Sequence, residues 1–68
     1  MSLKRYVIDL RTLSESERSR IYDLLDGHYA ETNMILTKEP HVYQLFMDES
    51  INPAKIDGLP PGLLRLVP

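Results

Sequence analysis

Apolar and polar residues alternate near the start of the chain, over residues 4–10. In an extended backbone this period of two places Tyr6, Ile8 and Leu10 on one side and leaves Val7 on the other, among charged residues. The pattern predicts a strand with one face in the core.

The next signals predict a helix over residues 15–26. Ser14 and Glu17 have the spacing of a capping box, in which the serine hydroxyl and the glutamate carboxylate each bind a backbone N–H at the helix start. Gly27 suits the left-handed residue that commonly follows a helix. Three apolar residues at helical spacing are expected to be buried: Ile21, Leu24 and Leu25. Two charge pairs are expected on the outer side: Glu15–Arg18 and Glu17–Arg20.

Two further segments, 34–38 and 41–48, predict an antiparallel hairpin. Both are rich in β-branched, aromatic and long apolar residues, and the Glu-Pro pair at 39–40 suits a turn between them. Alternation separates two faces in the second segment. One face carries Tyr43, Leu45 and Met47, and the other carries Val42, Gln44 and Phe46.

The last third of the chain changes character. An Asn-Pro pair at 52–53 suits the start of about one helical turn, which Gly58 would end. The proline- and glycine-containing stretch 59–62 suits a type II turn. The run 63–67 is mostly apolar and must pack against other residues of this chain or of a partner.

Together these elements predict a single α+β domain over residues 1–68. Residues 1–50 form a β-α-β-β core, which is most of a ferredoxin-like or split βαβ unit, truncated where a second helix would stand. Residues 51–68 form an irregular, Pro-rich, apolar C-terminal segment. This segment contributes a short fourth strand or lies over the sheet as a lid.

A single helix covers only one face of such a sheet. Val7, Val42 and Phe46 then remain on the opposite face, and the C-terminal run lies near them or covers them. An exposed apolar patch of this kind is unusual for a monomer. The sequence therefore predicts a partner interface of six residues: Val7, Val42, Phe46, Leu63, Leu64 and Leu66.

Size and composition also favour association. A chain of this length buries only about 60% of the surface that its unfolded form exposes, and without cysteine it cannot form disulfides. Its two histidines are the only soft metal ligands, so no metal or cofactor is expected. The lack of cysteine, of a long apolar run and of a signal-peptide pattern predicts a cytoplasmic protein with no membrane span.

The sequence contains no motif for catalysis or phosphate binding. The serines near the helix start are interpreted as caps. His28 and His41 could act as an acid–base pair, but positions after a helix end and after a turn are commonly solvated. A small enzyme with a site between subunits is therefore the third hypothesis, and no catalytic residue is assigned.

The formal net charge of −2 offers no surplus of cations for nucleic acid. The first hypothesis is a small protein–protein interaction or regulatory protein without catalytic activity, acting as a homodimer or a docking subunit. A nucleic-acid-binding module is the alternative, because a dimer could concentrate four arginines: Arg5, Arg11, Arg18 and Arg20.

Overall fold

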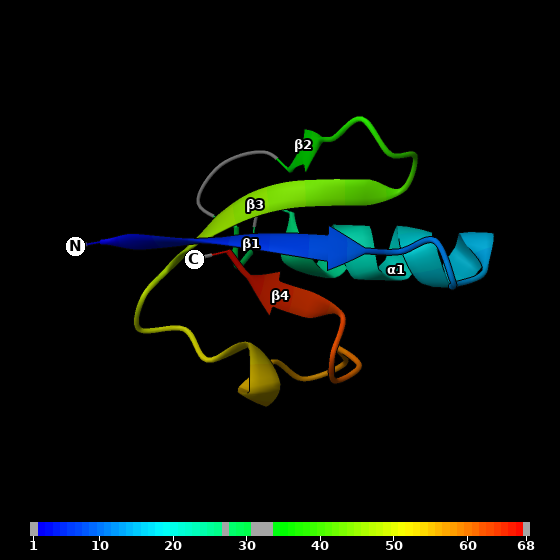
Figure 1. The fold of residues 1–68 in the computed structure, drawn as a ribbon. Coiled ribbons are helices and arrows are strands. Elements are labelled where there is room, and N and C mark those ends of the chain that lie inside the picture. The colour runs from blue at the N-terminus through cyan, green and yellow to red at the C-terminus, as the bar shows by residue number, and fades with distance from the viewer. Residues whose placement is uncertain (1, 27, 31–33, 68) are drawn as a thin grey trace.

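The computed structural model describes residues 2–26, 28–30 and 34–67, which form a small α+β fold. One α-helix lies against one face of a four-stranded antiparallel sheet (Figure 1). In chain order the elements are β1 (Leu3–Asp9), α1 (Glu15–Leu25), β2 (Ile35–Leu36), β3 (Val42–Asp48), the 3-10 turn η1 (Pro53–Lys55) and β4 (Leu64–Leu66). The predicted α+β class is confirmed, and the C-terminal run does contribute a fourth strand.

The strands lie in the order β2-β3-β1-β4, and each neighbouring pair is antiparallel. β1 and β2 therefore run in the same direction with β3 between them, and α1 lies in the connection that joins them. This is the split βαβ arrangement. The ferredoxin-like comparison stays an interpretation, because η1 is the only helical turn described between β3 and β4.

The predicted hairpin forms, but β2 is only two residues long. Thr37 follows β2, and its hydroxyl donates to the Val42 carbonyl (2.9 Å) and accepts from the Glu39 N–H (3.2 Å). A threonine side chain that binds the backbone in this way favours a turn over further strand. The hairpin turn therefore begins earlier than the sequence pattern suggested.

Only half of the predicted capping box is present at the start of α1. The Glu17 N–H donates to the Ser14 hydroxyl at 3.3 Å, but the Glu17 carboxylate accepts from Arg20 at 2.9 Å instead of reaching back to Ser14. The Glu17–Arg20 pair is thus confirmed. The predicted Glu15–Arg18 pair is wrong, because the Arg18 guanidinium donates instead to the backbone carbonyl that precedes the helix. Gly27 lies outside the described residues.

The core lies between α1 and one face of the sheet. Its buried members are Tyr6, Ile8, Leu10, Ile21, Leu25, Met34, Leu45, Met47 and Ile56. The predicted inward faces of β1 and β3 are thus confirmed, although Tyr43 is only partly buried. Leu24 is also only partly buried, contrary to prediction, because it lies on the flank of α1 beside Gly58.

The C-terminal segment follows the predicted turns and then joins the sheet edge. The Asn52 side chain accepts from the Ala54 N–H at 3.0 Å, which starts η1. Gly62 has the positive φ of 86° that the third position of a type II turn requires. β4 then pairs with β1 in the plane of the sheet. The alternative of a lid over the sheet is therefore wrong.

Candidate binding surfaces

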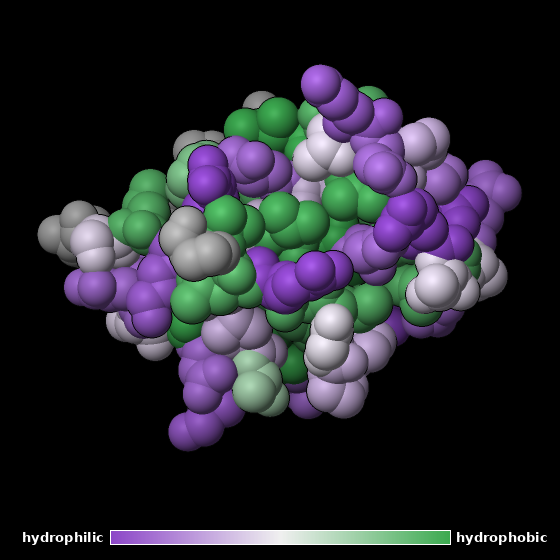
Figure 2. Space-filling model, viewed as in Figure 1, coloured by the Kyte–Doolittle hydropathy of each residue, from purple (hydrophilic) through white to green (hydrophobic). Residues whose placement is uncertain are grey.

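The sheet face opposite α1, here called the open face, carries no helix or strand in the described part of the chain (Figure 1). Strand register and alternation assign it eleven residues: Leu3, Arg5, Val7, Asp9, Ile35, Val42, Gln44, Phe46, Asp48, Arg65 and Val67. Figure 2 views this face and shows apolar residues gathered across its middle, with charged residues between and around them. The face is therefore amphipathic.

The structure separates the six predicted interface residues into two groups. Val7 and Phe46 lie half-buried on the open face, where Val42 is already 91% buried and offers little further area. Leu64 pairs with Ile8 and Leu66 pairs with Tyr6, so register places both on the helix side of the sheet. Leu63 and Leu64 pack against the core.

The prediction placed both groups on one surface, and this is wrong for the three leucines near the C-terminus, which do not lie on the open face. Two residues that the prediction missed do belong to the open face. Leu3 is 49% exposed and Ile35 is 48% exposed. Both are at ends or edges of the sheet, and only the strand register assigns them to this side.

The charges on the open face are balanced in sign. Two arginines, Arg5 and Arg65, and two aspartates, Asp9 and Asp48, belong to it. Arg11 binds both carboxylate oxygens of Asp9, with N···O distances of 2.9 and 2.7 Å. These hydrogen bonds, with the backbone N–H of Arg11 and the charge of Arg65, lower the pKa of Asp9 to about 2. The carboxylate is therefore ionised near neutral pH.

The four arginines of the nucleic-acid alternative occupy different surroundings. Arg11 bridges Asp9 and Glu39, and Arg20 binds Glu17 and the Gly58 carbonyl. Arg18 lines a pocket between α1 and the start of β3, and Arg5 belongs to the open face. The described residues therefore show no single basic surface formed by these side chains within one chain.

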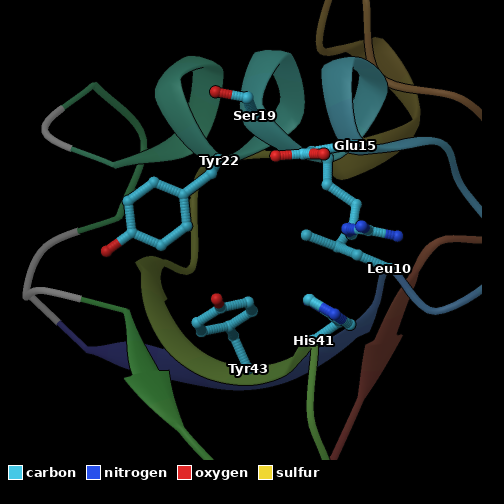
Figure 3. Close-up of a pocket in the computed structure, with 7 residues that line it drawn as sticks. Leu10, Glu15, Ser19, Tyr22, His41 and Tyr43 are labelled. Atoms are coloured by element: carbon cyan, nitrogen blue, oxygen red, sulfur yellow. The ribbon is translucent and has the colours of Figure 1, made fainter.

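A second surface feature is a cavity of about 330 Å³ between α1 and the start of β3, here called the helix–sheet pocket. It is lined by Leu10, Glu15, Arg18, Ser19, Tyr22, His41 and Tyr43. The residues from α1 are three or four positions apart and so share one helix face. In Figure 3, Tyr22 and Tyr43 lie on one side of the opening, and Glu15, Leu10 and His41 surround the other.

Aromatic packing shapes one wall of this pocket. The rings of Tyr22 and Tyr43 meet edge to face, with centroids 5.4 Å apart and an interplanar angle of 66°. Burial, followed by the nearby Asp26 carboxylate, raises the pKa of Tyr22 above its ordinary value. The phenol is therefore neutral at physiological pH and can donate a hydrogen bond.

His28 and His41 do not form a pair. His41 lines the helix–sheet pocket near the start of α1, whereas His28 follows the end of α1 and lines a separate hollow with Asp23 and Asp57. The two positions thus lie near opposite ends of α1, an eleven-residue helix about 16 Å long. The arrangement does not support acid–base catalysis by the two histidines together.

Within residues 2–26, 28–30 and 34–67, no group of three or more His, Asp or Glu side chains is placed to hold a metal ion. No helix in these ranges has the length and apolar character required to cross a membrane. No protein-family model, curated protein or solved structure matches this chain.

Proposed function

We propose that this protein is a small, non-catalytic interaction domain of the cytoplasm that binds a second copy of itself through the open face. The single observation that carries the proposal is the uncovered, amphipathic face of the sheet. Its apolar residues, which include Val7, Phe46 and Ile35, lie between charged ones. Apolar side chains on such a face gain free energy when a partner removes them from water.

The charge pattern favours a second copy over a strongly charged partner. In a two-fold symmetric contact the same surface occurs on both sides, so each arginine of one copy needs an acidic group in the other. Asp48 on the open face provides such a group, whereas Asp9 is already neutralised by Arg11 of its own chain. A polyanion such as nucleic acid would instead meet the Asp48 carboxylate on the same face.

The size of the face sets the expected strength of association. β1 and β3 have seven residues each, β4 has three and β2 has two. At about 3.3 Å per residue and 4.8 Å between strands, the face has a footprint of roughly 300 Å². This is less than half the area that each partner contributes to a standard interface. Because only about half of the face is apolar, its burial contributes about 4 kcal/mol per copy before association costs, so we expect a weak dimer.

Sedimentation equilibrium at high micromolar concentration tests the proposal. The unmodified protein should show dimer mass, and Phe46→Asp should show monomer mass because a charge then lies in the apolar centre of the contact. Leu36→Asp is the matched control, since Leu36 is 62% exposed on the helix side of the same sheet. It should leave the dimer intact.

Circular dichroism of each variant separates lost association from lost folding. An unmodified protein that remains a monomer at high micromolar concentration contradicts the proposal. Equal weakening of the dimer by Phe46→Asp and Leu36→Asp contradicts the assignment to the open face. Salt-dependent binding of nucleic acid in a fluorescence titration would favour the alternative function instead.

A further inference from the structure

The helix–sheet pocket is independent of the open face, because Tyr43 pairs with Ile8 on the helix side of the sheet. Its volume of about 330 Å³ lies at the lower end of the range for small-molecule sites, about 300–1,000 Å³. Leu10 and the two tyrosines provide an apolar and aromatic wall. A ligand for this pocket is therefore small and has an apolar part.

Two opposite charges line the same pocket without pairing with each other. Glu15 and Arg18 are three residues apart on α1, a spacing that commonly gives an ion pair, but the described ion pairs do not include them. Arg18 is held instead by its 2.7 Å hydrogen bond to the Leu13 carbonyl. The guanidinium has further N–H groups that can bind a carboxylate.

This pair of charges discriminates between ligand classes. A ligand with only a negative charge would be attracted by Arg18 and repelled by Glu15. A ligand with only a positive charge would be attracted by Glu15 and repelled by Arg18. A small zwitterion can place its ammonium near Glu15 and its carboxylate near Arg18, so that both interactions are favourable.

We propose that the helix–sheet pocket binds a free α-amino acid with an apolar or aromatic side chain. Its ammonium group binds the Glu15 carboxylate, and its carboxylate binds the Arg18 guanidinium. Its side chain packs against the rings of Tyr22 and Tyr43, where an aromatic group can adopt the edge-to-face geometry that these rings already show.

The test is an NMR titration of the full chain with three related probes. L-phenylalanine carries both charges, 2-phenylethylamine carries only the positive charge, and 3-phenylpropionate carries only the negative charge. We expect L-phenylalanine to shift the backbone signals of residues around the pocket at millimolar concentration. Each single-charge probe should bind about tenfold more weakly, because it lacks one charge-assisted hydrogen bond.

Two variants assign the charges. Glu15→Gln should remove the advantage of L-phenylalanine over 3-phenylpropionate, and Arg18→Gln should remove its advantage over 2-phenylethylamine. Glu17→Gln is the matched control, because it removes another carboxylate from the first turn of α1 outside the pocket. Glu17→Gln should leave the affinity for L-phenylalanine within about twofold. Glu15→Gln and Glu17→Gln remove the same favourable interaction with the helix dipole, so a difference between them reports the contact of Glu15 with the ligand.

Circular dichroism confirms that each variant is folded before its titration is interpreted. The proposal is overturned if L-phenylalanine causes no shifts around the pocket, or if a single-charge probe binds as tightly as the zwitterion. It is also overturned if Glu17→Gln weakens binding as much as Glu15→Gln. A monomeric protein that binds L-phenylalanine would contradict the proposed dimer and leave this inference supported.

Discussion

Replacement of Ser14 by alanine tests how α1 begins. The Ser14 hydroxyl accepts the Glu17 N–H at 3.3 Å, which is longer than the usual 2.9–3.0 Å for this type of bond. The reciprocal half of the capping box is missing because Glu17 binds Arg20. Loss of an N-cap side chain generally costs about 0.5–2 kcal/mol. For this long, solvent-exposed bond we expect the lower part of that range, about 0.5–1 kcal/mol.

Urea denaturation followed by far-ultraviolet circular dichroism measures this change. For a small domain the free energy of unfolding falls by about 1 kcal/mol per molar urea, so Ser14→Ala should lower the midpoint by roughly 0.5–1 M. A total stability of about 3–10 kcal/mol is expected for 68 residues, which makes this shift easily measurable.

Ser19→Ala provides the control for the same chemical change. Ser19 lies within α1 and is exposed, and alanine has the higher helix propensity, so its midpoint should stay the same or rise slightly. Equal midpoints for Ser14→Ala and the unmodified protein would refute the reasoning. So would equal decreases for the two variants, because the effect would then not belong to the cap.

Two further predictions concern the sheet side of the molecule. Arg11 lowers the pKa of Asp9 from 3.8 to about 2, so the folded state favours the ionised carboxylate; its stabilisation is present above about pH 4 and is lost as pH falls towards 2. A carboxyl NMR titration should give the lowered pKa for Asp9. Asp9→Asn should reduce the loss of stability between about pH 4 and pH 2. A pKa near 3.8 in the folded protein would contradict the assignment. His41 has a φ of 63°, which costs a residue with a side chain about 1–2 kcal/mol. His41→Gly should therefore be neutral or stabilising by up to about 1 kcal/mol, whereas His41→Val should lower the urea midpoint, and similar midpoints for the two variants would argue against a strained backbone.

Local periodicity was sufficient to predict the elements that form most of the core. The alternation of Tyr6, Ile8 and Leu10 gave the inward face of β1, because a strand repeats every two residues. Ser14 correctly marked the start of α1. The pattern failed for Leu24, which helical spacing places near the core but which lies at the flank of α1. The helical spacing shows that Leu24 lies beside the apolar face of α1, but it does not show how far the sheet extends over that face.

Non-local pairing was beyond the reach of these patterns. The apolar run that contains β4 was recognised as needing a partner, but its sequence does not specify an edge or a face. The register of Leu64 with Ile8 and Leu66 with Tyr6 decides that these side chains lie on the helix side. A shift by one residue would have exposed the other set to the open face. The predicted interface therefore combined residues that the sheet separates.

The helix–sheet pocket shows the same limit for a functional site. Its lining comes from the end of β1, from α1 and from the start of β3, so no contiguous motif records it. The sequence did contain the Glu15–Arg18 spacing, which predicts a pair that satisfies both charges on the helix surface. In the structure, the Leu13 carbonyl holds Arg18 in place of Glu15. Both charges thus line a pocket with two aromatic rings, and this arrangement makes a zwitterionic ligand the natural hypothesis.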